Sequence, residues 1–223
     1  MKLLKLFILS SLVSFSCKQE QKTNTQDPIL SVSEKIANAH GIEHWDKVAN
    51  LEFTFNVDRD SSHSERSWIW NPKTNDVTLF MQNDTIVYNR SNIDSTNLNA
   101  DKRFINDKFW LFFPFQLVWD EGITFSDPII TIAPINKKEL NKITALYSNE
   151  GGYTPGDAYD IFYNDEYMIE EWIYRRANAA EPSLSCTFEN YRDFNGIKLA
   201  LDHKKSGEIW NLNFTNIKVV LQD

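Results

Sequence analysis

The sequence has 223 residues, a length that suits one or two globular domains. Hydrophobic residues make up 42% and charged residues 24%, a mixture that excludes both a disordered tail and a membrane-embedded chain. The formal charge is −8, from 23 basic and 31 acidic side chains. A net-acidic chain without a basic cluster lacks the cations that hold nucleic-acid phosphates, so we expect no nucleic-acid partner.

Residues 1–16, MKLLKLFILSSLVSFS, are typical of a secretory signal. Lys2 and Lys5 provide the positive start, and the apolar run 6–15 is shorter than the roughly 20 residues that a membrane-spanning helix needs. Cys17 follows directly, as in a lipoprotein signal, where this cysteine is diacylated and becomes the mature N-terminus. The alternative is ordinary secretion with Cys17 unused.

The next segment predicts a tether. Residues 18–27, KQEQKTNTQD, contain no apolar side chain and cannot contribute to a core. With the lipidated Cys17 they form a polar tether over 17–27. Lys18 stands where the inner-membrane retention signal has an aspartate, which favours an outer-membrane lipoprotein that faces the periplasm or the cell surface. Cys186 is the one further cysteine, so no internal disulfide is expected and this thiol is predicted to be buried.

A first helical segment is expected over residues 28–48. Ile36, Ala37 and Ala39 recur at helical spacing after Ser33, which is a suitable N-cap residue. Gly41 interrupts the pattern, so the segment predicts two short helices or one kinked helix.

The period then changes to two, which indicates antiparallel strands. Leu51, Phe53, Phe55 and Val57 alternate with polar residues. Further strands are expected at 67–70, 77–81, 85–88, 142–147, 158–163, 167–176, 184–191, 197–204 and 209–221. Asn195-Gly196 predicts a type I′ hairpin, because both residues tolerate positive φ.

A second helical segment, residues 100–119, interrupts the strands. Its part 109–119, FWLFFPFQLVW, contains Gln116 as its one polar residue, and Pro114 must kink or end the helix. The segment either fills a core against the sheet or forms the apolar wall of a ligand cavity. In the second case the expected contacts are Phe109, Trp110, Phe112, Phe113, Phe115 and Leu117.

Together these patterns predict a mainly β fold. We expect a single curved antiparallel sheet of about ten strands, with the two helical segments packed on its concave side. One domain covers 28–223, and the protein is expected to be a monomer.

The sharpest local motif is His40-Gly41-Ile42-Glu43-His44, which matches the H-x-x-E-H pattern of inverted zinc peptidases. His40 and His44 would bind zinc, Glu43 would take a proton from bound water, and Glu121 would be the third ligand. Gly41 breaks the helix that must aim both rings, so the competing interpretation is a pair of surface or capping histidines. We therefore expect no metal, no cofactor and no enzymatic activity, with a zinc hydrolase as the rival hypothesis.

Two other ligand classes are weaker alternatives. Asp157 and Asp160 lie in a glycine-rich stretch where a turn would hold calcium, but the spacing fits no EF-hand. Alternatively the protein is a surface interaction or glycan-binding module with a filled core, in which Trp68, Trp70 or Tyr153 stack on sugar faces.

Two stretches of the chain resemble a known family. The opening His40-Gly41-Ile42-Glu43-His44-Trp45, followed by Val48 and a strand, is similar to openings of LolA/LolB-like outer-membrane lipoprotein-localisation proteins and their lipoprotein relatives. The stretch 189–199, ENYRDFNGIKL, resembles their Y-R-D-x-x-G-x-K hairpin.

The resemblance implies a half-open antiparallel β-barrel closed by helices, whose apolar concavity holds acyl chains. The segment 100–119 would then lie at the concave side, and Arg66 and Arg90 are candidates for a gating arginine by position. The function expected is reversible binding of a lipid, an acyl chain or another apolar small molecule by a protein anchored in the membrane through its N-terminal lipid.

Overall fold

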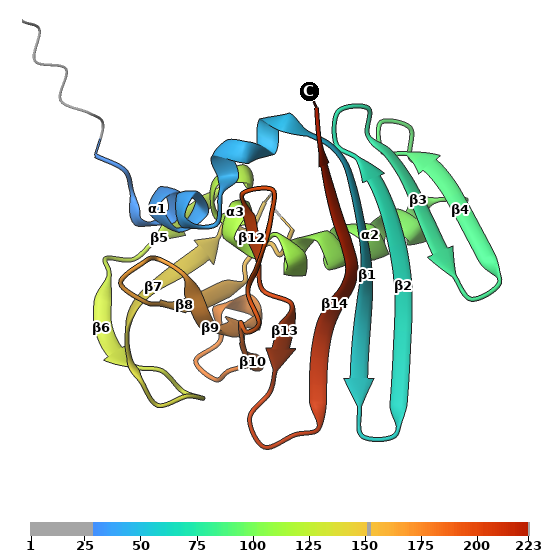
Figure 1. Ribbon diagram of the computed structural model, residues 1–223. Coiled ribbons are helices and arrows are strands. Elements are labelled where there is room, and N and C mark those ends of the chain that lie inside the picture. Colours follow the sequence, from blue (N-terminus) through green and yellow to red (C-terminus); the bar gives the residue numbers. More distant parts are fainter. Residues whose placement is uncertain (1–28, 151–152, 223) are drawn as a thin grey trace, which may run out of the picture.

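The computed structural model describes residues 29–150 and 153–222 (Figure 1). The predicted signal 1–16, the lipidation site Cys17 and the tether up to residue 27 lie outside the described residues. Within them, fourteen strands form three antiparallel sheets, none of which closes into a barrel. The mainly β prediction is confirmed, but the single sheet of about ten strands is not.

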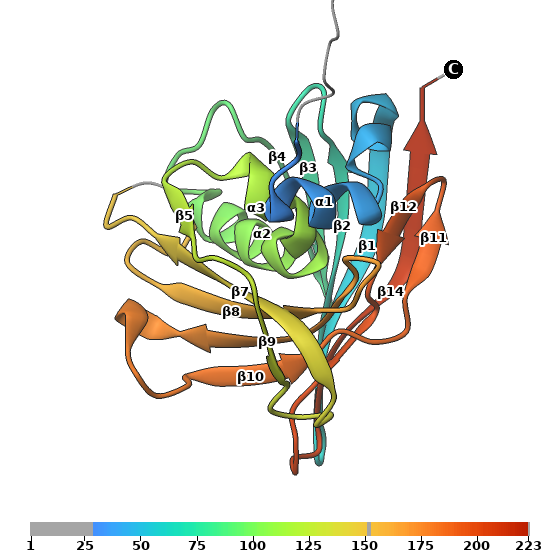
Figure 2. The ribbon, with the colours of Figure 1, turned by 90° about the vertical axis from the view of Figure 1, so that its left-hand side faces the viewer.

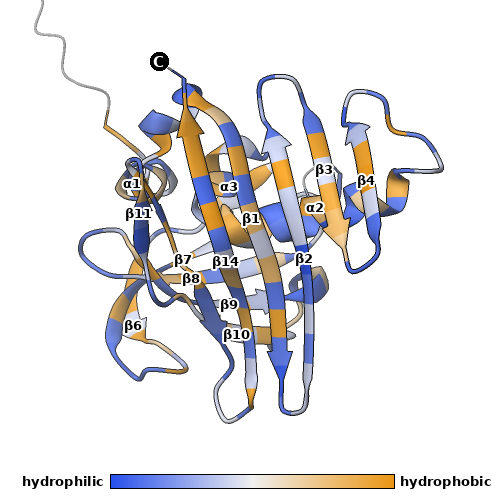
Figure 3. Ribbon diagram, turned by 45° about the vertical axis from the view of Figure 1, so that its right-hand side comes forward, coloured by the Kyte–Doolittle hydropathy of each residue, from blue (hydrophilic) through white to orange (hydrophobic). Residues whose placement is uncertain are grey.

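Sheet A is the larger curved wall of the molecule. Its strands, in spatial order, are β13 (Asp202–Lys204), β14 (Trp210–Leu221), β1 (Val48–Arg59), β2 (Ser62–Asn71), β3 (Asp76–Met81) and β4 (Asp84–Asn89). Hydrophobic and hydrophilic bands alternate along β14 and β1 (Figure 3), as a strand with one buried face requires. Leu51, Phe53 and Phe55 are buried as expected, whereas Val57 is only half-buried.

Sheet B crosses the lower part of the molecule in Figure 2. Its strands, in spatial order, are β10 (Leu184–Thr187), β9 (Ile169–Arg175), β8 (Ala158–Tyr163), β7 (Glu139–Tyr147) and β5 (Ile123–Phe125), and β6 (Ile129–Ile132) also pairs with β7. The short 3₁₀ helix η2 (Arg176–Asn178) follows β9.

The two large sheets meet at a corner where the sequence predicted continuous strands. The expected strand 184–191 ends early because Asn190 has a φ of 56°, and the bridge Glu189–Asp202 is the pairing that links the sheets there. The expected strand 197–204 is also divided, since Ala200 and Leu201 are both buried and so break the alternation. The third sheet is the hairpin of β11 (Arg192–Phe194) and β12 (Ile197–Leu199).

The first helical segment contains two short helices, α1 (Val32–Ala39) and the 3₁₀ helix η1 (Ile42–Lys47). Gly41, with a φ of 86°, separates them as predicted. The N-cap is Ser31 and not Ser33. The Ser31 hydroxyl accepts from the amide of Glu34, whose carboxylate accepts from the amide of Ser31 at 2.7 Å.

The second helical segment is α2 (Leu98–Leu111) followed by α3 (Phe113–Trp119). The two helices meet at Phe112, and Pro114 lies in the first turn of α3, so the predicted kink is confirmed. Both helices lie in the angle between sheets A and B (Figure 2). In the part of the chain that the structure describes, no helix has the length and apolarity to cross a bilayer.

Candidate functional site

The α2–α3 segment is a wedge between the two large sheets. Phe112 and Phe115 belong to the buried cluster of sheet A, whereas Phe109, Phe113 and Leu117 belong to that of sheet B. These five side chains are at most 3% exposed, and the half-buried Trp110 packs against both clusters. The structure therefore brings all six predicted contact residues into the interior, on both faces of the wedge.

Toward sheet B the wedge makes close aromatic contacts. The ring centres of Phe113 and Trp172 lie 4.4 Å apart in an edge-to-face arrangement, and those of Trp110 and Trp172 lie 4.7 Å apart. Phe109 lies 4.5 Å from Tyr153. Such pairs contribute about 0.5–1.5 kcal/mol each beyond the area that they bury.

Toward sheet A the wedge completes a cluster with tryptophans from other elements. Phe112 lies 5.1 Å from Trp45 of η1, and Phe115 lies 5.2 Å from Trp119 at the end of α3. Trp45 and Trp119 are 4.8 Å apart and both are half-buried, so this cluster reaches the surface.

In this state the wedge fills the interior. Five hollows of about 330 to 550 Å³ on the described surface are lined by residues from other segments. Since the six side chains already pack between the sheets, a ligand that took their place would require the wedge to move.

An ion pair connects the wedge to sheet A. Arg66 of β2 donates from Nε and Nη2 to the two carboxylate oxygens of Asp107 of α2, both at 2.6 Å. Asp107 also accepts from Nε1 of Trp68 at 2.8 Å and from Asn106 at 3.0 Å. Burial raises the pKa of Asp107, while the hydrogen bonds and charge of Arg66 oppose that rise. The paired guanidinium also lies 4.6 Å from the ring centre of Phe55.

A second ion pair repeats this arrangement near the start of α2. Arg90, just after β4, donates from Nε to Asp101 at 2.8 Å, and the hydroxyl of Tyr88 donates to the same oxygen at 3.3 Å. Arg66 and Arg90 were candidates by position alone, and both bind the helix that covers the interior.

Lys108 supplies a third charge on the wedge. Its ammonium group lies 5.5 Å from the ring centre of Trp119 and 6.0 Å from that of Trp70. Burial, helped by the charge of Arg90, lowers the pKa of Lys108 to about 8. Sequence reasoning missed Asp101, Asp107 and Lys108, although charged residues that interrupt an amphipathic pattern were the available signal.

The zinc motif has a different role in the structure. Nδ1 of buried His40 donates to the carbonyl of Ile36 at 2.7 Å, and Nε2 faces the hydroxyl of Tyr191 at 3.2 Å. Burial lowers the pKa of His40 to about 4, so the ring is neutral near pH 7. Both nitrogens already have partners, and no group of three potential ligands gathers around a metal position within 29–150 and 153–222. The geometry does not support the zinc hydrolase hypothesis.

The two sequence motifs that carry the family resemblance touch each other. A Cβ on Gly41 would overlap the carbonyl oxygen of Gly196, and one on Gly196 would overlap the ring of His44. The amide of Lys198 donates to the carbonyl of His40 at 3.0 Å. Asn195 and Gly196 have φ values of 56° and 91°, so the predicted left-handed hairpin turn is confirmed.

Comparison with known proteins gives no match to a family model and none to a curated protein sequence. Among solved structures, a LolA superfamily protein from Nitrosomonas europaea aligns at 11% identity, over 87% of this chain and 95% of that one, with a TM-score of 0.47. A DUF1329 family protein from Desulfovibrio piger aligns at 9% identity, over 84% and 92%, with a TM-score of 0.47. A putative outer membrane lipoprotein-sorting protein domain from Vibrio parahaemolyticus aligns at 10%, over 84% and 93%, with a TM-score of 0.43.

The chain is thus similar in structure to a LolA superfamily protein, the family that its sequence motifs resemble.

The residues named for glycan or calcium binding have other contacts in the structure. Trp68 and Trp70 are 1% and 6% exposed, so neither offers a ring face to a sugar. Asp157 accepts from the hydroxyl of Tyr174 and from a backbone amide, and Asp160 pairs with Arg175 at 3.0 Å. These contacts give both carboxylates a structural role, and Gly151 and Gly152 lie outside the described residues.

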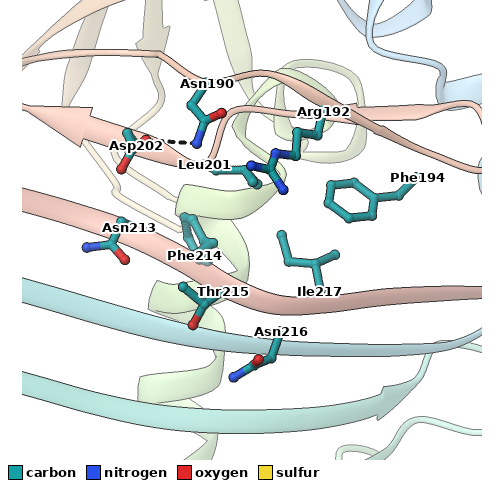
Figure 4. Close-up of a pocket in the computed structure, with 10 residues that line it drawn as sticks. All are labelled: Asn190, Arg192, Phe194, Leu201, Asp202, Asn213, Phe214, Thr215, Asn216 and Ile217. Atoms are coloured by element: carbon teal, nitrogen blue, oxygen red, sulfur yellow. Dashed lines mark hydrogen bonds between the residues drawn. The ribbon is translucent and has the colours of Figure 1, made fainter.

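A hollow of about 380 Å³ lies on the outside, between β14 and the β11–β12 hairpin (Figure 4). Arg192 and Phe194 of the hairpin face Ile217 of β14 across it. The hairpin of the family motif therefore borders the outer surface of sheet A, whereas the wedge lies on the inner side.

Proposed function

We propose that the protein reversibly binds a lipid, an acyl chain or a similar apolar molecule between sheets A and B, with the α2–α3 wedge as a displaceable cover. The six residues Phe109, Trp110, Phe112, Phe113, Phe115 and Leu117 are the proposed contacts. The observation that carries the proposal is the pairing of Arg66 with Asp107, an ion pair with a fully buried carboxylate that fixes α2 to sheet A.

If α2 served only as core, apolar residues in place of Arg66 and Asp107 would often make the protein as stable or more stable. Buried ion pairs often contribute less than well-packed hydrophobic residues of similar volume, because both charges lose their hydration. Such an ion pair does, however, fix a helix in one position on a sheet, and when the pair breaks the whole helix is freed. The pairs Arg66–Asp107 and Arg90–Asp101 thus favour a cover with a defined closed position.

The interface around the wedge also contains unsatisfied polar groups. Among the described residues, four buried side-chain nitrogens have no hydrogen-bond partner in the protein: Nε1 of Trp70, Nε1 of Trp172, Nε2 of Gln116 and Nε2 of His203. Each such group costs about 1–3 kcal/mol relative to a satisfied one. The closed interior is therefore less stable than its apolar area alone implies, which lowers the free energy needed to open it.

The segments that flank the wedge suit a movement of this kind. The preceding stretch, residues 90–97, consists of turns and bends, and its side chains are mostly polar and exposed. After α3, Gly122 has a φ of 75° and begins the return to sheet B. The wedge is thus joined to the sheets by short polar connections on both sides.

The free energy gained when a ligand binds depends on the apolar area that it buries between the sheets. Burying an acyl chain is favourable by ~25 cal/mol per Å² of apolar surface, before the cost of ordering the chain. The alternative for these residues is a permanently filled core, in which no acyl chain enters.

The test combines lipid analysis with a probe. Protein purified gently from its own cell envelope should carry a co-purifying lipid that mass spectrometry detects. The Cys17→Ser chain, freed of lipid, should bind a dansyl-labelled undecanoic acid, with energy transfer from the interior tryptophans to the dansyl group.

Cys186 gives an independent readout of the same site. It is buried in the cluster of Phe109 and Phe113, and in the Cys17→Ser chain it is the remaining thiol. A saturating concentration of the acyl probe should change the rate at which Cys186 reacts with a thiol reagent. Probe binding and thiol reaction both require the interior to open. Absence of both lipid and probe binding in folded protein would show that the wedge is permanent core.

A further inference from the structure

Strand β6 presents apolar side chains to solvent in a way that sheet B does not require. Ile129, Ile130 and Ile132 are 51%, 67% and 56% exposed. Because neighbouring residues of a strand point to opposite faces, both faces of β6 are apolar and open. Within the described residues β6 pairs with β7 alone, so its other edge is also unpaired. Three exposed isoleucines gathered on one short strand indicate an interaction site.

Pairing with a second copy fits this strand poorly. β6 has four residues and follows Pro128, which cannot donate to a neighbouring strand. Stable interfaces between proteins bury about 1,200–2,000 Å² in total, far more than a four-residue edge supplies. The surface therefore requires a partner that accepts scattered apolar side chains without a matching strand.

The start of α1 lies on the same side of the molecule as β6 (Figures 1 and 2). The turn between β8 and β9 lies between them. The ammonium group of Lys35 of α1 donates to the hydroxyl of Tyr167 at 3.4 Å, and Asp165 lines the same hollow as Ile130. At the beginning of the described chain, Ile29 is 88% exposed. The described chain thus begins on the face that carries the isoleucines, and the sequence predicts that a lipid-bearing tether precedes it.

The segments around this face carry charges of both signs and no basic excess. The basic residues are Lys35, Lys137, Lys138 and Lys142, and the acidic residues are Glu34, Asp127, Glu139, Asp165, Glu166 and Glu170. Attraction to an anionic surface is therefore weak, and the apolar side chains are the groups that provide binding.

We propose that β6 and the start of α1 form a membrane-contact surface that inserts Ile129, Ile130 and Ile132 into the interface of an electrically neutral bilayer. The proposal rests on the predicted N-terminal anchor and not on the binding of a ligand in the interior. It gives the tethered domain a fixed orientation, with one side of sheet B against the lipid.

The first experiment measures depth in the membrane. The full lipidated chain carrying Ile130→Cys is labelled with nitrobenzoxadiazole and reconstituted into phosphatidylcholine vesicles, while the buried Cys186 stays unlabelled. The label should shift its emission to the blue and be at least twofold brighter than the same label at Ile209→Cys. Ile209 is 75% exposed and lies in the β13–β14 turn, so it is a matched control. Equal emission from the two positions overturns the proposal.

The second experiment measures partitioning without the anchor. The Cys17→Ser chain should bind the same vesicles, and Ile130→Ser with Ile132→Ser should weaken the partition coefficient about tenfold or more, since each buried isoleucine contributes at least one factor of this size. Binding should be insensitive to salt. Val87→Ser with Ile209→Ser, which removes two equally exposed side chains elsewhere, should leave it unchanged.

Two further results decide against the proposal. If the parent chain forms a dimer and the Ile130→Ser, Ile132→Ser variant does not, β6 binds a second copy of the chain. Equal partitioning of both double variants overturns the role of β6 even if the interior binds the dansyl-labelled probe. Mass spectrometry of the N-terminus tests the anchor separately, because the second experiment does not depend on it.

Discussion

Gly41 is under two constraints that substitution can separate. Its φ of 86° is strained for any residue with a side chain, and a Cβ there would overlap the backbone of Gly196. Gly207 has a φ of 73° with open space around the missing Cβ. Gly207→Ala should therefore lower the free energy of unfolding by about 1 kcal/mol, from strain alone.

Gly41→Ala should cost more, roughly 3 kcal/mol, because overpacking against backbone adds to the strain. Urea unfolding of both variants, followed by tryptophan fluorescence, gives the comparison. Equal losses in the two variants would mean that the contact between the two motifs adds nothing to stability.

The residue-level predictions succeeded where backbone geometry is local. Gly41 as a helix break and Asn195-Gly196 as a left-handed turn follow from φ preferences that each residue carries with it. Their mutual contact did not follow, because the two sites are far apart in sequence and only the closed fold brings them together. The capping box at Ser31 was overlooked, although Glu34 three residues later is the local signal for it.

For the α2–α3 element, Arg66→Met is the decisive substitution. It leaves the Asp107 carboxylate buried without its cation, which should lower the free energy of unfolding by about 3 kcal/mol. If the wedge opens as a unit, Cys186 in the Cys17→Ser background should react with a thiol reagent faster under native conditions. The apparent affinity for the dansyl-labelled acyl probe should rise as well, since a larger fraction of the protein is open.

Lys218→Met is the control, because Lys218 and Glu52 form an exposed pair at 3.2 Å on sheet A. It should change stability by less than about 0.5 kcal/mol and leave the thiol rate unaltered. If the rate in Arg66→Met rises only in proportion to global unfolding, the wedge does not open separately from the domain.

At this scale the helices were more predictable than the site that they form. Their apolar spacing and Pro114 are sequence features, and α2 and α3 lie within two residues of the expected segment. The pairing of Asp107 with Arg66 depends on how α2 rotates against β2, which no local pattern determines. The angle between the sheets buries both faces of the wedge, which the apolar spacing of one segment does not reveal.

The whole molecule should lose stability as the pH falls. Burial lowers the pKa of His40 and of His203 to about 4, from about 6.5 in an unfolded chain. The unfolded state therefore binds more protons between these values, so stability is complete above pH 6.5 and declines as the pH approaches 4. The raised pKa of Asp107 acts in the opposite direction, because its folded form takes up a proton first.

His203→Asn isolates one of these contributions. Nδ1 of His203 donates to the carbonyl of Thr187 at 3.1 Å, and an asparagine amide offers a similar donor without titrating. The fall in unfolding free energy between pH 6.5 and 4 should become shallower by up to about 1.4 kcal/mol per pH unit. Urea unfolding across this pH range checks it, and parallel curves for variant and parent would exclude a titrating role for His203.

The arrangement of the sheets was the least predictable property. Most of the expected strands are present, and their antiparallel order follows from short connections such as the turn between β3 and β4. The alternating sequence pattern does not predict the corner at Glu189–Asp202. This corner arises where the expected strands 184–191 and 197–204 bend to enclose the wedge. A count of strands from sequence thus did not reveal that they divide into separate sheets.

In the centre of sheet A, β1 is hydrogen-bonded to β14, although about 150 residues separate them in the chain. Pairings of such high contact order form slowly, because a long loop must close before they add stability. A ribosome-bound or partly exported chain therefore lacks the partner for β1 until residues 210–221 are free. For the secretion that the sequence predicts, we expect this delay to favour an unfolded chain during translocation, with sheet A forming on the far side of the membrane.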